Sequence, residues 1–245
     1  MNKKQFIIGL IWVVIFVVII GGIYLLVKPD EPIINNGTQN QKDLIILFQD
    51  FLPTTENNYD LIAKVQNPNA NWGVESVNYE FDLYDSANQL IGTKTGKTYL
   101  LPQETKYIIE QRIFLQKSIS KIELKLDNIS WKKLAQASDL GLRVKNTEYQ
   151  ILEDGSNLLV GTVENKSSYD LDTIEVVGVL FDENNKIIAV GKTSMNTVLR
   201  NENRGFEIFW PYLIVQETKS FDAKAYTNVF LNENFIKTQG EPPKE

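Results

Sequence analysis

The chain has 245 residues, of which 43% are hydrophobic and 23% charged, a balance typical of a folded protein with one large or two small domains. It contains no cysteine and no histidine. This excludes disulfides, thiolate metal sites, a cysteine nucleophile and the histidine chemistry of most hydrolases and metalloenzymes. The formal net charge of −6 gives an acidic surface that repels phosphates, so we expect no nucleic-acid partner.

An uncharged apolar segment occupies residues 6–27, directly after residues 1–5, whose only charges are Lys3 and Lys4. At about 1.5 Å per residue, a helix of this length spans roughly 33 Å and crosses the hydrocarbon core of a bilayer. The run is longer than the core of a cleaved signal peptide, and no small-residue cleavage site follows it. We therefore expect a retained, single-pass anchor in the cell membrane. The two lysines before the anchor predict a cytoplasmic N-terminus and extracytoplasmic C-terminal domains.

Two polar segments border the part of the chain that can bury a core. Residues 28–42 are rich in Pro, Asn, Gln and Gly and predict a flexible linker. The last residues, QGEPPKE, have a similar composition, and we expect a disordered tail over residues 232–245.

From residue 43 the chain is punctuated like a β protein, because apolar runs of about 5–9 residues alternate with clusters of Asn, Gly, Pro and Asp. Six runs predict strands in the first half, at residues 44–51, 59–67, 74–84, 89–99, 106–115 and 118–129. The one plausible helical piece is WKKLAQASDL, residues 131–140, within a connector over residues 131–141.

The same order of residues then recurs, and residues 61–92 align with residues 159–191. The alignment pairs Val65 with Val163, Asn67 with Asn165, Asp85 with Asp182 and Asn88 with Asn185. Each unit of about 90–100 residues, with about seven short strands, has the size of an immunoglobulin-like sandwich. We therefore predict an all-β fold of two tandem immunoglobulin-like β-sandwiches, at residues 43–130 and 142–231, preceded by a single transmembrane helix.

Two neighbouring carboxylates in EFDLYDSANQLIG, residues 80–92, raise the question of a catalytic or calcium site. The alternation of apolar residues in this strand places Asp82 on the face opposite the core, where we expect solvent. Asp85 ends the strand, and its carboxylate can accept backbone N–H bonds in the DSANQ turn, as Asp182 can in DENNK. The two carboxylates of the first copy point to opposite faces, and the turn supplies few of the six to eight oxygens that calcium takes. We therefore expect structural roles.

The residues FDLYD (81–85) fit the pattern Phe-x-Leu-Tyr-Asp, and on this motif the chain resembles the FxLYD domain family. The likeness extends to the preceding strand and its asparagine, and to the turn after the motif. That family occurs in exported and membrane-anchored prokaryotic proteins. The resemblance implies a small immunoglobulin-like sandwich and no known catalytic residues. Its motif residues are Phe81, Leu83, Tyr84 and Asp85 in the first copy and Leu180, Phe181 and Asp182 in the second, divergent copy, which has Gly178 in place of the first Phe.

The other candidate motifs favour structural interpretations. GKT at 96–98 and at 191–193 lacks the upstream glycine of a phosphate loop, and the Ser and Lys of SISK alternate with Ile as in a solvated strand. Trp72, Trp131 and Trp210 are expected in a core or at a domain junction. We assign no catalytic, cofactor-binding or metal-binding residue and expect no cofactor.

One strand of the second copy, TIEVVGVLFD (173–182), is apolar on both faces. Ile174, Val176 and Leu180 share one face, and Val177, Val179 and Phe181 lie on the other. Since a sandwich strand needs only one apolar face, something should cover the second. We predict that Val177, Val179 and Phe181 form a docking surface for the other domain, the connector or a partner chain. A loop of the same sandwich is the alternative.

These features favour a non-catalytic, membrane-anchored extracytoplasmic protein, whose two sandwiches are interaction or spacer modules at the cell envelope. Its partners would be the lipid bilayer, through residues 6–27, and other envelope or membrane proteins. One alternative is an accessory subunit of a larger membrane assembly, in which the span contacts other helices. A second is an enzyme of envelope saccharides that uses carboxylates alone.

Overall fold

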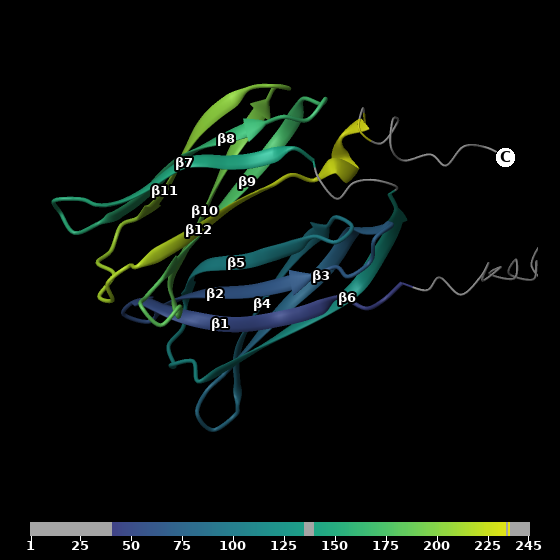
Figure 1. Ribbon diagram of the computed structural model, residues 1–245. Helices are drawn as coiled ribbons and strands as arrows, with labels where there is room; N and C mark the ends of the chain where they lie inside the picture. Colours follow the sequence, from purple (N-terminus) through teal and green to yellow (C-terminus); the bar gives the residue numbers. More distant parts are fainter. Residues whose placement is uncertain (1–40, 135–139, 234, 236–245) are drawn as a thin grey trace, which may run out of the picture. The chain divides into compact units, whose positions relative to one another are not determined.

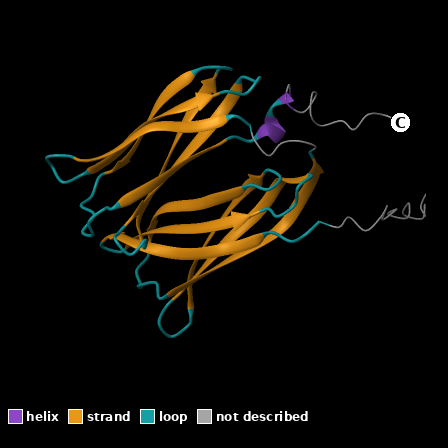
Figure 2. Ribbon diagram, viewed as in Figure 1, coloured by secondary structure: helices purple, strands orange, loops and turns teal. Residues whose placement is uncertain are grey.

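The computed structural model describes residues 41–134, 140–233 and 235 (Figure 1). Its regular elements are twelve strands and a short 3-10 turn, so the described part of the chain has an all-β fold (Figure 2). The anchor predicted at 6–27 and nearly all of the linker predicted at 28–42 lie outside the described residues. Among the residues that are described, none belongs to a helix long and apolar enough to cross a membrane.

The strands divide into two successive sets of six. The first set is β1 (Ile45–Thr55), β2 (Asn58–Gln66), β3 (Trp72–Tyr84), β4 (Leu90–Leu100), β5 (Thr105–Phe114) and β6 (Lys121–Lys133). The second set is β7 (Leu142–Ile151), β8 (Asn157–Asn165), β9 (Leu171–Phe181), β10 (Ile187–Val198), β11 (Asn203–Trp210) and β12 (Ser220–Tyr226), followed by the 3-10 turn η1 (Val229–Leu231).

Both sets have the same topology. The first set forms three-stranded sheets in the orders β1-β2-β5 and β4-β3-β6, and the second forms sheets in the orders β7-β8-β11 and β10-β9-β12. All of these neighbouring strands are antiparallel. The sequence repeat is therefore a repeat of structure, with strand n of the first set matching strand n + 6. Each unit has six strands in the described residues, where the sequence predicts about seven.

A hydrophobic core lies between the two sheets of each unit. In the first sandwich, alternate residues of β2 and β3 meet there, including Leu61, Phe81 and Leu83. In the second sandwich, the equivalent core contains Leu159 and Leu180. This alternation is the period-two pattern of a strand with one buried face, and it turns the other face of each strand outward.

Gly178 explains why the second copy departs from the motif. A Cβ at this position would lie 2.9 Å from both Ile208 Cδ1 and Leu159 Cδ2, and 3.5 Å from the indole of Trp210. Trp210 is buried, and its indole N–H donates to the carbonyl oxygen of Val190 at 2.8 Å. Gly178 is equivalent to Phe81 of the first sandwich, whose side chain lies in the core. In the second sandwich, Trp210 from β11 occupies the space beside this position instead.

A fully buried asparagine lies at the end of the second strand of each sandwich, directly after β2 in the first and as the last residue of β8 in the second. Asn67 and Asn165, which the repeat aligns, are both inaccessible to solvent. In each, the amide nitrogen donates to carbonyl oxygens of loops and strand ends, and the amide oxygen accepts a hydrogen bond from the backbone N–H two residues further on, over 2.7–3.1 Å. The asparagine side chain thereby satisfies its own buried polar atoms and ties the loop to neighbouring backbone.

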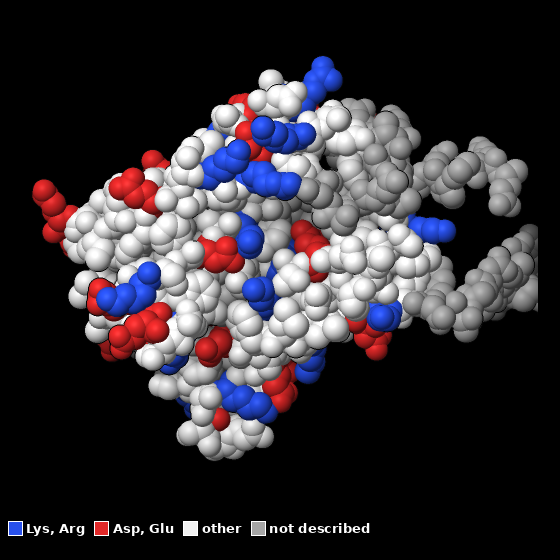
Figure 3. All heavy atoms as spheres, in the orientation of Figure 1, with Lys and Arg blue, Asp and Glu red and all other residues white. Residues whose placement is uncertain are grey.

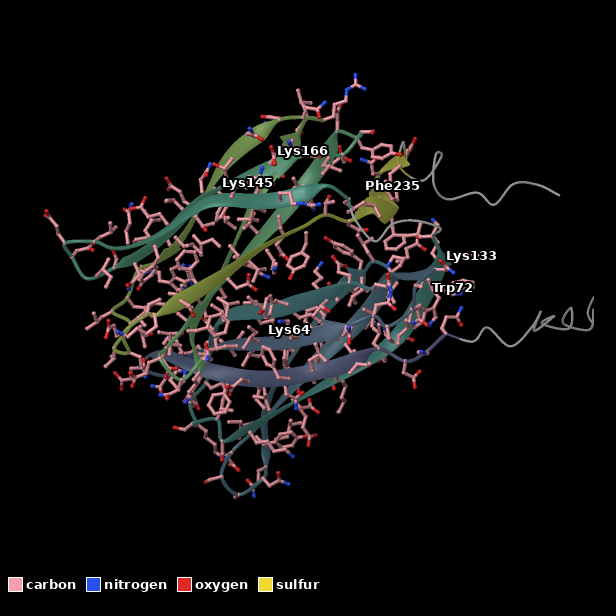
Figure 4. The ribbon with its side chains drawn as sticks, viewed as in Figure 1. Lys64, Trp72, Lys133, Lys145, Lys166 and Phe235 are labelled. Carbon is pink, nitrogen blue, oxygen red and sulfur yellow. The ribbon has the colours of Figure 1, made fainter. Side chains whose placement is uncertain are left out.

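The connector and the tail differ from the sequence-based expectation. Trp131–Lys133 are the end of β6 and not helix, because they continue the pairing with β3 as far as Lys133 opposite Trp72 (Figure 4). Residues 135–139 of the connector are not among the described residues. The tail predicted to be disordered from residue 232 is ordered at its start. Asn232 donates to the carbonyl oxygen of Asp170 at 2.7 Å, and Phe235 is only 3% exposed.

Candidate functional site at the junction of the two sandwiches

The outer face of sheet β1-β2-β5 packs against the outer face of sheet β10-β9-β12, as the ribbon shows (Figure 1). We call this contact the junction. One buried apolar cluster spans it, with four side chains from each sandwich. They are Leu52, Ile62, Tyr107 and Ile109 from the first, and Val177, Val179, Val190 and Tyr226 from the second. The junction is therefore a second kind of core, formed between the sandwiches and not within either.

The predicted docking residues lie in the junction. Val177 is 1% exposed and Val179 is fully buried, and Phe181 packs against the same cluster while staying partly exposed. What covers the stripe is the first sandwich, so neither a loop of the second sandwich nor a partner chain is needed to bury it. Each fully buried side chain of this kind contributes roughly 1.5–3 kcal/mol relative to exposure.

Hydrogen bonds to backbone groups fix how the two faces meet. Lys192 Nζ donates to the carbonyl oxygen of Ile109 at 2.9 Å, and Gln111 Nε2 donates to the carbonyl oxygen of Val190 at 3.2 Å. The backbone N–H of Tyr107 donates to the Tyr226 hydroxyl at 3.3 Å. Such bonds are directional, so they set one register between two surfaces that apolar packing alone would leave free to slide.

A buried carboxylate adds a further link. Asp60, on β2, accepts the Tyr212 hydroxyl of the second sandwich at 3.3 Å and the backbone N–H of Arg112 at 2.9 Å. Burial raises the pKa of Asp60, and these hydrogen bonds oppose the rise. The Asp60 carboxyl thus accepts one hydrogen bond from each sandwich, which gives it a structural role.

A cleft of about 400 Å³ opens beside the junction, with walls from both sandwiches. Lys97, Tyr99 and Lys106 line it from the first sandwich. Asp172, Glu175 and Tyr226 line it from the second, together with polar residues around η1. On the face shown in Figure 3, basic and acidic side chains are interspersed, whereas in the cleft the two signs come from opposite walls.

Lys106 is the most unusual residue of the cleft. It is 3% exposed, and its Nζ lies 3.4 Å from the ring centroid of Tyr99 and 5.1 Å from that of Tyr226. Within the described part of the chain, this Nζ has no hydrogen-bond acceptor and no carboxylate within 4.0 Å. Burial lowers the pKa of Lys106 to about 8, although Glu104 and Glu175 oppose the change.

Asp85 of the FDLYD stretch and its counterpart Asp182 both have structural roles in turns. Asp85 accepts the backbone N–H groups of Ala87 and Gln89, both at 3.0 Å, which are the bonds expected of its turn. Asp182 accepts the equivalent groups of Asn184 and Lys186, both at 2.9 Å. The two turns are thus the same, and both carboxylates are occupied by backbone donors.

The burial of Asp82 differs from the sequence-based expectation that its side chain faces solvent. Asp82 lies on the outer face of β3, as predicted, but it is only 4% exposed and not solvated. Lys125 from β6 donates to it at 2.5 Å and Thr93 from β4 at 3.1 Å, so the neighbouring strands cover it. The Lys125 bond is the main reason that the pKa of Asp82 is lowered. A carboxylate held ionised in this way is a poor general acid.

The other residues of the FxLYD-like motif pack within the sandwiches or on an outer sheet face. Phe81, Leu83 and Leu180 are buried in the two sandwich cores, and Tyr84 is half-buried on the outer face of β3. Within the described residues, no three acidic side chains gather as metal ligands would. The cleft at the junction is therefore the better candidate for a functional site than the motif.

No protein-family model and no curated protein matches the chain. Among solved structures, a transglutaminase from red sea bream is similar over 76% of this chain, at 9% sequence identity and a TM-score of 0.26. The chain spans 31% of the length of that protein. A likeness this low supports no argument about the activity of the chain. What the fold and junction define is a class: an all-β protein of two repeated sandwich units packed face to face.

Proposed function

We propose that the chain is a non-catalytic, membrane-anchored protein of the cell envelope whose two immunoglobulin-like sandwiches act together as one interaction or spacer module. The observation that supports this most strongly is the junction. Domains of one chain normally move relative to each other unless their interface is large and hydrophobic. Here eight buried side chains and several backbone-directed hydrogen bonds join the sandwiches.

The sequence supports the remainder of the proposal. Residues 6–27 are long and apolar enough for a membrane anchor, and the polar linker after them would separate the module from the bilayer. The FxLYD domains that the sequence resembles occur in exported and membrane-anchored proteins. The second copy departs from that motif at Phe181, which packs against the junction. Its divergence therefore fits a domain adapted to pack on its neighbour.

The proposal is tested with the full-length chain, tagged at its C-terminus, in the cells that produce it. Protease added to intact cells should remove the tag and the sandwiches and leave a small membrane-embedded fragment. A tag that stays protected in intact cells but is cleaved after lysis would contradict the topology.

A variant tests whether the sandwiches or the span provide the interactions. In it, an unrelated apolar helix replaces residues 6–27. Cross-linking on intact cells followed by detergent extraction should give the same cross-linked partners for this variant and the wild type. Loss of those partners in the variant would instead support an accessory subunit that assembles through its span.

A further inference from the structure

We propose that the cleft beside the junction binds a small monocarboxylate that also carries hydrogen-bond donors, with the carboxylate on the Lys106 ammonium group and the donors toward Asp172 and Glu175. This goes beyond a spacer function, because it assigns the two-domain module a ligand. It also differs from the protein contacts proposed above, because the ligand lies between the sandwiches.

The first argument is that Lys106 lacks an acceptor. A buried ammonium group is strongly disfavoured unless it is paired or hydrogen-bonded. The rings of Tyr99 and Tyr226 stabilise a cation through their faces but accept no strong hydrogen bond. A ligand carboxylate at Lys106 would supply the missing acceptor and make a charge-assisted hydrogen bond away from bulk water.

The second argument is the separation of charge across the cleft. Lys97 and Lys106 stand on the wall from the first sandwich, and Asp172 and Glu175 on the wall from the second. In the described residues, no ion pair joins these two walls, and the one ion pair of Glu175 is a 3.9 Å contact with Lys192 of its own sandwich. The walls thus present opposite charges to the space between them.

This pattern selects the ligand class. Two lysines against two carboxylates leave little net charge, so a single carboxylate is favoured over a multiply charged phosphate. Asp172 and Glu175 accept hydrogen bonds and would hold an ammonium or hydroxyl group at the other end of the ligand. A volume of about 400 Å³ is within the usual range of small-molecule sites and admits an amino acid or a monosaccharide acid.

The test uses the purified full-length chain in mild detergent at pH 7 and measures binding by isothermal titration calorimetry. The probes are L-leucine and D-glucuronate, with L-leucinamide and D-glucose as analogues that lack the carboxylate. We expect at least one acid to bind with a Kd below about 1 mM and its analogue to bind at least tenfold more weakly. Leucine binding alone would identify an amino-acid site and glucuronate binding alone a sugar-acid site.

Two variants locate the binding. Lys106→Met should weaken it at least tenfold. Lys64→Met is the matched control. Lys64, labelled in Figure 4, also lies over a tyrosine ring, that of Tyr107, but is not among the residues that line the cleft. The control variant should bind as the wild type does. Thermal unfolding monitored by circular dichroism shows whether each variant is folded. The proposal is overturned if neither acid binds the wild type, if folded Lys106→Met binds equally well, or if the analogues bind as tightly as the acids.

Discussion

Replacing Lys106 with methionine should make the chain more stable at neutral pH, and this gain should shrink as the pH rises. The Lys106 side chain is buried and its pKa is about 8, compared with 10.5 for an ordinary lysine. That gap corresponds to about 3 kcal/mol of lost stability whenever the ammonium is charged. Methionine has a similar length and no charge. Losing the contact with Tyr99 offsets part of the gain, so we expect a net increase of about 1–3 kcal/mol at pH 7.

The sign of the pH dependence follows from proton binding. Between pH 8 and 10.5 the unfolded chain holds the Lys106 proton more tightly than the folded chain, so wild-type stability should rise through this window. The charged groups that act on Lys106 are Glu104 and Glu175, which favour its charge, and Lys192, which opposes it. Burial raises the pKa of both neighbouring tyrosines, Tyr99 and Tyr226, so they stay protonated there.

Urea unfolding at pH 7, 8, 9 and 10 measures this effect as the difference between the variant and the wild type. The difference should be largest at pH 7 and should fall steadily above pH 8. Lys64→Met, measured in parallel, accounts for the loss of one positive charge from the same sandwich. A Lys106→Met chain that is less stable than the wild type at pH 7, or a difference independent of pH, would refute the reasoning.

Three further substitutions test the fold. Asn165→Ala should lower the free energy of unfolding by about 3 kcal/mol, because it removes the buried amide's hydrogen bonds to the carbonyl oxygens of Tyr169, Val198 and Leu199; an unchanged urea midpoint would contradict this. Gly178→Ala should cost about 1–3 kcal/mol, since its Cβ would press on Ile208 and Leu159, and a loss below about 0.5 kcal/mol would show that the core relaxes freely. Asp85→Ala and Asp182→Ala should each lower the melting temperature by a few degrees and leave ligand or partner binding intact once the protein is folded. Binding lost at an unchanged melting temperature would point to a functional carboxylate.

Local patterns in the sequence predict much of the fold. Alternation in residues 77–83 identifies the buried face of β3, and the turns at Asp85 and Asp182 form because short side chains bond to the backbone beside them. The repeat, aligned through Asn67 and Asn165, matches the duplicated topology. Each of these features depends on residues close together in the chain or on a pattern that occurs twice.

Features that depend on distant residues could not be predicted in this way. Alternation assigns Asp82 to the outer face, but only the pairing of β3 with β4 and β6 brings Thr93 and Lys125 over it. Trp131 continues a strand because β3 lies beside it, against the helical pattern of its own segment.

The candidate site shows the same limit. The apolar second face of β9 predicts that the strand is covered, without naming the cover. Lys106 is an ordinary polar residue in a strand until the second sandwich brings Tyr226 against it. No signal in a single sequence indicates a cleft whose two walls come from residues about 65–135 positions apart.

The central claim is that the junction joins the two sandwiches into one unit, and differential scanning calorimetry of the full-length chain tests it most directly. The wild type should unfold its two sandwiches in a single cooperative transition. Val179→Lys places an ammonium group in the buried junction and should split this transition into two, while each sandwich still folds. Val160→Lys, the same change on the outer face of β8 and away from the junction, should leave one transition. Two transitions in the wild type, or one transition at an unchanged temperature in Val179→Lys, would contradict the account.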